Sequence, residues 1–318
     1  MLKFQSGKHK IHLKFVQKVY FMIPLTEIFV HVDDFCKIFE EKIKEFAIEN
    51  SYKRKRNKPM RMNLSEIITI MIMFHTSHYK TFKDFYINCI LITYKREFPR
   101  AVSYSRFVTL MQYALMPMTI FMLGIKGEET GKYFVDSTKL SVCHNLRITR
   151  NKVFKGVARR GKTSTGWFFG FKLHIVINNK GEIMNFRITK GNVDDRAPVE
   201  ILMKNLNGWL FGDKGYISKK LSETLLDKGV ELITNIKKGM QKVFLAPAKK
   251  YLLKKRFVIE TMIDQLKNKL TIDHTRHRSV HNFFLNIVSA LVAYQFLPKK
   301  PSIGFAALNN ISERAVLI

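Results

Sequence analysis

The first regular pattern of apolar and polar positions along this chain is helical. Between Thr26 and Phe46, apolar side chains recur every three or four residues, with lysine and glutamate on the positions between them. The apolar positions are Ile28, Val32, Phe35, Phe39, Ile43 and Phe46. This spacing predicts an amphipathic helix with one buried face.

Two capping boxes introduce the next helices. Asn63 with Glu66, and Thr81 with Asp84, have the required spacing directly ahead of apolar runs. A third helix is predicted to begin near Ser103, so residues 60–120 form a compact bundle of the helix-turn-helix type. Such bundles more often serve packing alone, and Arg106 is therefore a candidate DNA contact that needs testing.

From Lys132 the pattern changes to short apolar runs rich in β-branched and aromatic residues. A hairpin is predicted around Asn179-Lys180, and strands then alternate with helices as far as residue 236. Three early antiparallel strands followed by this alternation predict a mixed five-stranded α/β sheet flanked by helices on both faces. The apolar stretch 284–297 is shorter than the ~20 residues of a membrane-spanning helix and predicts a buried helix.

Single acidic residues stand where two predicted strands end. Asp136 follows the apolar run 133–135, and Asp213 follows the run 209–211. In open α/β sheets, functional sites lie beyond such strand ends, although one acid there more often orders a turn or caps a helix. Glu260 lies in a segment with helical apolar spacing. Together the three acids predict a candidate metal cage, the arrangement that two-metal phosphodiester chemistry requires.

The formal charge of +30, from 55 Lys+Arg against 25 Asp+Glu, favours a polyanionic partner, most simply nucleic acid. Basic clusters fall at 53–61, 147–162 and 237–256. The polybasic run 52–61 is interpreted equally well as a solvated loop or as an arm that contacts phosphates. Six cations in or near these clusters and the acids are candidate phosphate contacts, of which the last two serve equally well as solvent-facing side chains. They are Arg54, Arg56, Arg159, Arg160, Lys139 and Lys214.

The remaining features of the sequence bear on the cellular compartment and on the domain boundaries. Cys36, Cys89 and Cys143 are widely separated, which argues against a disulfide framework or a zinc site and fits a reducing cytoplasm. Residues 1–21 lack the apolar core of a secretory signal and are a candidate non-native extension ahead of Met22. Two domains are predicted, a helical region at 22–125 and a sheet domain at 130–300, followed by a tail at 301–318.

Other polar residues have simpler interpretations. Asp194 and Asp195 are expected to cap a helix near Pro198, and they are held in reserve as alternative site acids. His174 lies in an apolar strand and is interpreted as a core histidine.

Four motifs occur in a characteristic order. They are FVDSTKL with Asp136, GNVDDR with Asp194, LFGDKGY with Asp213 and RFVIETMIDQLK with Glu260. Over roughly residues 24–300 the chain resembles bacterial insertion-sequence transposases of the ribonuclease H-like superfamily that carry an Asp-Asp-Glu triad, most nearly insertion-sequence family 982. The resemblance implies a ribonuclease H-like domain behind an all-α DNA-binding region, with Asp136, Asp213 and Glu260 as the catalytic, metal-binding triad.

The same resemblance implies a tyrosine-arginine-glutamate-lysine signature around Glu260. Arg256 and Lys267 match its two cations and are implied to hold DNA phosphates, whereas Leu253 takes the place of the tyrosine, with Tyr251 nearby. The implied cofactor is a pair of Mg²⁺ ions, with Mn²⁺ as a substitute. The implied partners are the double-stranded DNA of the element ends and target, bound by at least a homodimer associated with the nucleoid and not with a membrane.

Two alternatives remain open. The same triad supports a metal-dependent nuclease that cuts DNA without joining it. A decayed or repurposed transposase would only bind DNA through its basic surface and helical bundle. RNA binding is a weaker alternative, since the sequence has no aromatic-rich RNA-recognition motif of the usual kind.

Overall fold

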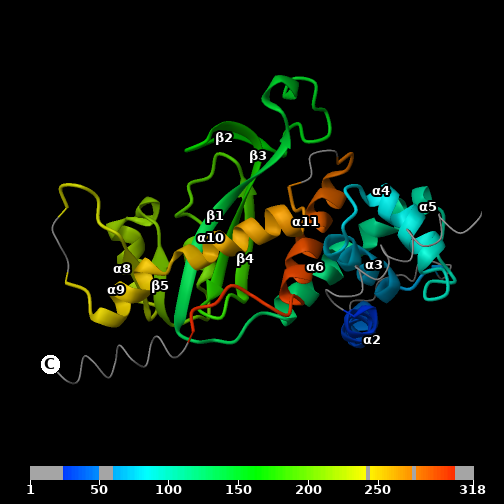
Figure 1. Cartoon of the computed structure of the whole chain (residues 1–318), viewed down its shortest axis with the longest axis horizontal. Coiled ribbons are helices and arrows are strands. Elements are labelled where there is room, and N and C mark those ends of the chain that lie inside the picture. The colour runs from blue at the N-terminus through cyan, green and yellow to red at the C-terminus, as the bar shows by residue number, and fades with distance from the viewer. Residues whose placement is uncertain (1–23, 50–59, 241–243, 274–276, 305–318) are drawn as a thin grey trace, which may run out of the picture. The chain divides into compact units, whose positions relative to one another are not determined.

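The computed structural model describes residues 24–49, 60–240, 244–273 and 277–304 (Figure 1). Arg54, Arg56, the candidate extension at 1–21 and most of the tail at 301–318 lie outside these residues. The chain divides into two compact units, one helical and one built on a sheet. We describe each unit by itself.

The helical unit comprises Met1–Gly124, Lys269–Ile272 and His281–Pro298. The helices predicted near Thr26, after both capping boxes, near Ser103 and over 284–297 are all confirmed. They are α2 (Leu25–Glu49), α3 (Leu64–Thr76), α4 (Phe82–Asp84), the π-helix η1 (Phe85–Thr93), α5 (Tyr104–Leu110), the 3₁₀ turn η2 (Met111–Ala114), α6 (Leu115–Gly124) and α11 (Val280–Gln295).

Local hydrogen bonds start these helices where the sequence predicts. The Glu66 carboxylate accepts a bond from the Asn63 backbone N–H at 2.7 Å, and the Thr81 hydroxyl accepts one from the Asp84 N–H at 3.3 Å. His75, fully buried on α3, contacts the Leu270 carbonyl at 2.6 Å and the Ser289 hydroxyl at 3.0 Å. These bonds connect α3 with α11, so residues distant in sequence share one helical core.

The continuous helical stretch Tyr104–Gly124 is long and apolar enough, by length and composition, to cross a membrane. However, Phe107, Leu110, Met118 and Phe121 on this stretch are all buried in the protein. A helix that buries such side chains within a protein core passes the same test of length and composition. We therefore interpret it as a core helix of the helical unit.

The other unit is built on a mixed sheet of six strands among the described residues, in the order β2-β3-β1-β5-β6, with β4 also paired to β3. Strands β1, β3 and β4 are antiparallel, and β5 and β6 run parallel to β1. This strand order confirms the predicted ribonuclease H-like α/β fold. The strands are β1 (Lys132–Cys143), β2 (Arg159–Thr163), β3 (Gly166–Asn178), β4 (Ile183–Lys190), β5 (Gly208–Gly212) and β6 (Val230–Thr234).

The sheet has one strand more than the five predicted, and the additional strand is β2. It lies within the basic cluster 147–162, which has no apolar pattern from which a strand is read. Because β3 extends beyond its pairing with β4, its first residues, 166–170, are free to pair with β2. The side chains of Arg159, Arg160 and Lys162 are exposed there, as charged residues on an edge strand commonly are.

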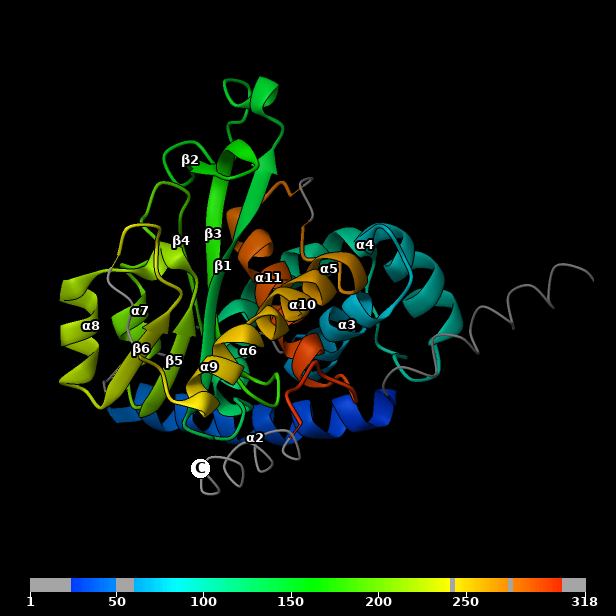
Figure 2. The same cartoon turned by 60° about the vertical axis from the view of Figure 1, so that its left-hand side comes forward.

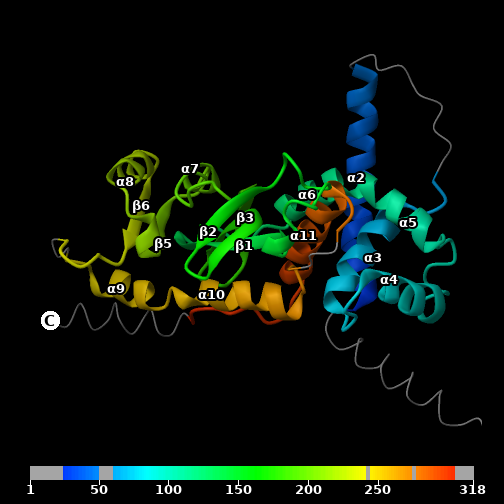
Figure 3. The same cartoon turned by 90° about the horizontal axis from the view of Figure 1, so that it is seen from above.

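Helices cover both faces of the sheet (Figure 3). One face carries α7 (Val199–Leu202) and α8 (Lys219–Leu226), and the other carries α9 (Pro247–Lys254) and α10 (Phe257–Asp264), which the π-helix η5 (Gln265–Lys269) continues. Tyr133, Val135 and Leu210 belong to the core on the α7 and α8 side. Since side chains alternate along a strand, Phe134 and Phe211 point to the opposite face, where their rings stack with centroids 5.3 Å apart.

Candidate active site

The register of β1 and β5 brings two of the predicted acids together. Phe134 pairs with Phe211, and Asp136 and Asp213 each follow that pair by two residues. Neighbouring strands lie about 4.8 Å apart, and residues two positions apart share a face, so both carboxylates are presented on the α10 side. Gly212 precedes Asp213 because a Cβ there would come within 3.2 Å of the Tyr216 side chain.

The third predicted acid comes from α10, which lies against β1 (Figure 1). Arg256, at the start of this helix, donates a hydrogen bond from Nη2 to Oε1 of Glu260 at 2.6 Å. Its guanidinium also lies 3.9 Å from Oδ2 of Asp136 and 4.0 Å from Oδ1 of Asp213. Carboxylate oxygens from two strands and one helix therefore surround a single cation.

The three acids differ in how far they are exposed to solvent. The side chain of Asp136 is 25% exposed, against 55% for Asp213 and 53% for Glu260. Burial raises the pKa of Asp136 to about 6, the Ser137 N–H and Arg256 lower it, and Glu260 and Asp213 raise it further. Asp136 is thus ionised at neutral pH at a cost in stability, which a bound cation would offset.

The three donors are of the chemical kind that a divalent cation such as Mg²⁺ binds. All are carboxylate oxygens, the ligands that Mg²⁺ prefers, and they converge on a position that a positive group already fills. In the described part of the chain, no three His, Cys, Asp or Glu side chains lie close enough together to hold a metal ion. The acids are held apart around Arg256, so a metal requires this guanidinium to withdraw.

Comparison with known proteins shows what the segment that carries these acids is similar to. Residues 126–280, just under half of the chain, match a family model described as "Transposase DDE domain". This segment is therefore similar to the DDE transposase domain. No curated protein matches the chain. Among solved structures it is similar to the piggyBac transposase synaptic complex with hairpin DNA, at 9% identity and a TM-score of 0.44, covering 83% of this chain and 74% of that one.

Arg256 offers a test of the position among the three carboxylates. We expect Arg256→Gln to lower the stability of the metal-free protein by about 1–3 kcal/mol, since Glu260 then loses its charged hydrogen-bond donor and Asp136 and Asp213 lose a nearby positive charge. Mg²⁺ should recover most of that loss by taking over the positive charge. Thermal unfolding with EDTA and with Mg²⁺ checks this result. Equal destabilisation under both conditions would contradict the shared role of guanidinium and metal.

The other predicted cations lie away from the three carboxylates or on other elements. Lys267 lies on η5 and pairs with Asp273 at 3.3 Å. The π-helical turn there changes the helical projection by which the sequence placed Lys267 beside Glu260. Lys139 donates a hydrogen bond to the Thr165 hydroxyl at 2.7 Å, and Lys214 is exposed next to Asp213. Arg159 and Arg160 are exposed on β2, and Arg106 is exposed on α5 of the helical unit.

The helix-cap interpretation of Asp194 and Asp195 is wrong. Pro198 occupies the N-cap of α7, and Asp194 instead accepts hydrogen bonds from the Arg196 backbone and side chain within the preceding turn. These bonds hold the pKa of Asp194 well below its usual range. Asp195 pairs at 3.0 Å with the ammonium of Lys172, a side chain only 10% exposed.

This partly buried pair belongs to a polar group on the α7 and α8 side of the sheet, and the sequence did not reveal that the group exists. His174 is fully buried, as its core interpretation requires, and contacts the Thr189 hydroxyl at 2.8 Å. Burial lowers the pKa of His174 to about 4, so it is neutral at pH 7. Burial, Asp136 and Asp195 raise the pKa of Tyr216 far above its usual value. The sequence motifs contain two of its members, Asp195 in GNVDDR and Tyr216 in LFGDKGY, but give no sign that they lie together.

The Lys172 pair has a measurable consequence for stability. We expect Asp195→Asn to destabilise the protein by about 1–3 kcal/mol, because it leaves the buried ammonium of Lys172 without a counter-charge. Asp194→Asn is the matched control and should cost less, since its partner Arg196 is solvent-exposed. Urea unfolding of the two variants checks the difference. Equal losses of unfolding free energy in the two variants would contradict the expectation that burial of Lys172 increases the cost of losing its counter-charge.

Proposed function

We propose that this chain is the transposase of an insertion sequence, related to insertion-sequence family 982. It binds the terminal inverted repeats of its element, hydrolyses a phosphodiester bond at each end and joins the freed 3′-hydroxyls to target DNA. One observation carries the proposal. In a segment that matches the DDE transposase domain, the oxygens of Asp136 on β1, Asp213 just after β5 and Glu260 on α10 converge on one cation.

In this proposal Asp136, Asp213 and Glu260 hold two Mg²⁺ ions, which Mn²⁺ can replace. Two ions bound there would stabilise the attacking and leaving oxygens of an in-line displacement. Arg256 leaves the carboxylates and holds a DNA phosphate, as proposed also for Lys267. Ser137 keeps the Asp136 carboxylate in place by donating its backbone N–H to Oδ1 at 2.7 Å.

DNA binding is proposed to rest on the exposed cations of both units. Arg159 and Arg160 on β2, with Lys139 and Lys214 nearer the acids, supply contacts to phosphates without reading sequence. Arg54, Arg56 and Arg106 are proposed contacts of the helical region, which supplies specificity for the repeats. Because each phosphate contact releases counterions, binding should weaken steeply with salt. Pairing of two element ends implies at least a dimer acting at the nucleoid in the cytoplasm.

A strand-transfer assay separates this function from its two alternatives. Labelled duplexes carrying the element's own ends are incubated with protein, target DNA and Mg²⁺, and with EDTA as the metal-free control. Joined product that requires Mg²⁺ is expected. Cleaved ends without joined product would favour the nuclease, and DNA binding without either product would favour the repurposed binder.

A further inference from the structure

The helical stretch Tyr104–Gly124 carries apolar side chains on two opposite faces. One face is buried in the helical unit, where α2 packs against α6 and the rings of Phe35 and Phe121 lie 5.1 Å apart (Figure 2). The opposite face presents four large apolar side chains, each between 44% and 64% exposed. They are Tyr113 on η2 and Met116, Ile120 and Leu123 on α6.

These four side chains form one continuous stripe along the helix, which we call the α6 stripe. They follow one another at intervals of three, four and three residues, so at about 100° per residue they fall within about 80° of one another. A surface helix ordinarily places polar residues on the face that points away from its core. A contiguous exposed apolar stripe instead marks a surface that another molecule covers.

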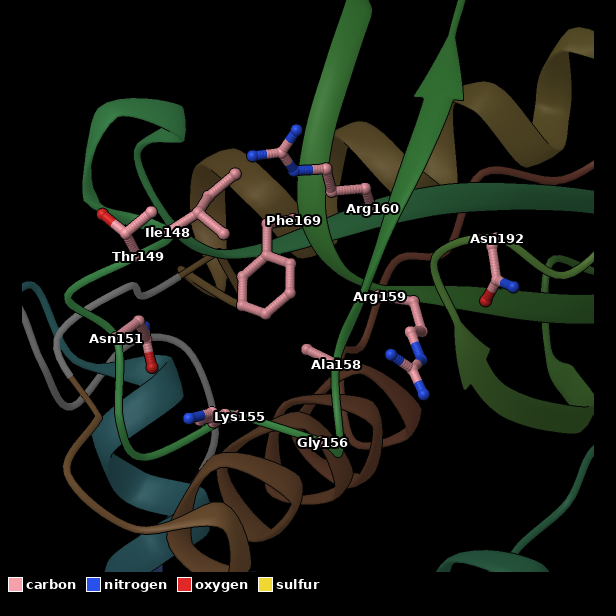
Figure 4. A pocket seen from close by; sticks show the side chains of 10 residues that line it. All are labelled: Ile148, Thr149, Asn151, Lys155, Gly156, Ala158, Arg159, Arg160, Phe169 and Asn192. Carbon is pink, nitrogen blue, oxygen red and sulfur yellow. The ribbon is translucent and has the colours of Figure 1, made fainter.

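The charge around the α6 stripe argues against DNA as that molecule. Arg106 is the one charged residue among the 21 of the stretch, whereas 25% of the whole chain is charged. DNA phosphates are bound by clustered cations, such as those that line the open hollow beside β2 (Figure 4), which are Lys155, Arg159 and Arg160. The α6 stripe offers the apolar surface that a protein partner buries instead.

A second copy of the chain matches the α6 stripe in both charge and spacing. Each copy carries a formal charge of +30, so two copies repel each other unless they meet where charge is scarce. An interface between two identical copies must also match itself about a two-fold axis. When two α6 stripes run antiparallel, Tyr113 lies opposite Leu123 of the second copy, and Met116 lies opposite Ile120. Every apolar position of one stripe then meets an apolar position of the other.

We propose that two copies of this chain associate through antiparallel contact between their α6 stripes, and that the pair forms without DNA. The proposed function already requires at least two copies, and the inference names the surface that joins them. The helical stretch is about 30 Å long, which is enough for several turns of one helix to pack along the other. The four side chains of each copy bury a small area, so the pair should dissociate on dilution.

Sedimentation of the full-length protein without DNA tests the pairing. The unchanged protein should shift from monomer to dimer as its concentration rises. Ile120→Glu places a carboxylate from each copy in the contact and should raise the dissociation constant of the pair at least about 30-fold, the scale of losing an interface hot spot. Leu226→Glu is the matched control, because it adds the same charge at an exposed apolar residue on α8, and it should leave the dissociation constant unchanged.

Cross-linking tests the antiparallel register. Tyr113→Cys and Leu123→Cys are prepared separately, each together with Cys143→Ser, and are oxidised alone and as an equal mixture. The two remaining native cysteines, Cys36 and Cys89, are buried. The mixture should give a disulfide-linked dimer, whereas each variant alone should give little, because identical positions lie at opposite ends of the contact.

Three results would overturn the inference: a monomer at every concentration, equal dimerisation by Ile120→Glu and the unchanged protein, or no mixed cross-link. A monomer at every concentration would leave the α6 stripe to another occupant, such as the chain's own residues 305–318 or a lipid surface. None of these measurements uses DNA, so such results leave the proposed function standing. Failure of the strand-transfer assay would likewise leave this interface standing.

Discussion

Replacement of Asp213 by asparagine is expected to reduce Mg²⁺-dependent cleavage of element ends by at least about 10³-fold, the scale of losing one electrostatic group of a catalytic centre. Asparagine keeps the size of the side chain and one oxygen but removes the charge that holds a metal. Binding of the same DNA should persist, because the phosphate contacts lie on other side chains. Gel assays of cleavage and of binding on one preparation check both expectations.

The matched control is Glu200→Gln, a carboxylate-to-amide change on α7, across the sheet from α10. Glu200 pairs with Lys228 and has no part in the proposed chemistry. Cleavage by this variant should equal that of the unchanged protein. If Asp213→Asn still cleaves at a comparable rate, Asp213 is not part of the catalytic centre. Asp195, the reserve acid of the sequence analysis, would then be tested next.

The second large effect is a gain of stability. We expect Asp136→Asn to stabilise the metal-free protein at pH 7.5 by on the order of 2 to 3 kcal/mol, since it removes a charge that folding places in a costly position. The pKa of Asp136 is raised to about 6 in the folded protein, above its ordinary value of 3.8. A catalytically inactive variant that is more stable than its parent would show that the site is arranged for function.

The gain in stability of Asp136→Asn should depend on pH. Between about pH 4 and pH 6 the folded protein keeps the proton of Asp136 while the unfolded chain loses it, so stability falls as the pH rises. Below about pH 4 the unchanged protein and Asp136→Asn should differ little, and above pH 6 the full difference should appear. Urea unfolding in EDTA from pH 4 to 8 measures it. A constant difference across that range would contradict the raised pKa.

Much of the fold follows from patterns in the sequence. The capping pairs at Asn63 and Thr81 begin helices through local hydrogen bonds, which depend on nearby residues alone. The apolar runs before Asp136 and Asp213 become adjacent parallel strands because each must bury its side chains in the same sheet. The interpretation of His174 as a core residue also agrees with its full burial.

What the sequence did not reveal depends on long-range contacts or on weak patterns. Strand β2 exists because β3 leaves an edge uncovered, and its own residues are mainly charged. Asp195 was assigned to a helix end nearby in sequence, whereas its partner Lys172 comes from a strand. Motif spacing placed Arg256 near Glu260 but gave no sign that its guanidinium lies among all three acids. The domain division at 22–125 and 130–300 stays a prediction.

The most direct test of the proposed metal centre is a count of bound Mn²⁺ on the DNA-bound protein, with free Mn²⁺ measured by electron paramagnetic resonance. The protein with Asp136, Asp213 and Glu260 intact is predicted to bind about two Mn²⁺ ions, because two-metal phosphodiester chemistry requires a pair. Asp213→Asn should bind fewer, and Glu200→Gln should bind as many as the unchanged protein. Equal Mn²⁺ binding by the unchanged protein and Asp213→Asn would contradict the account.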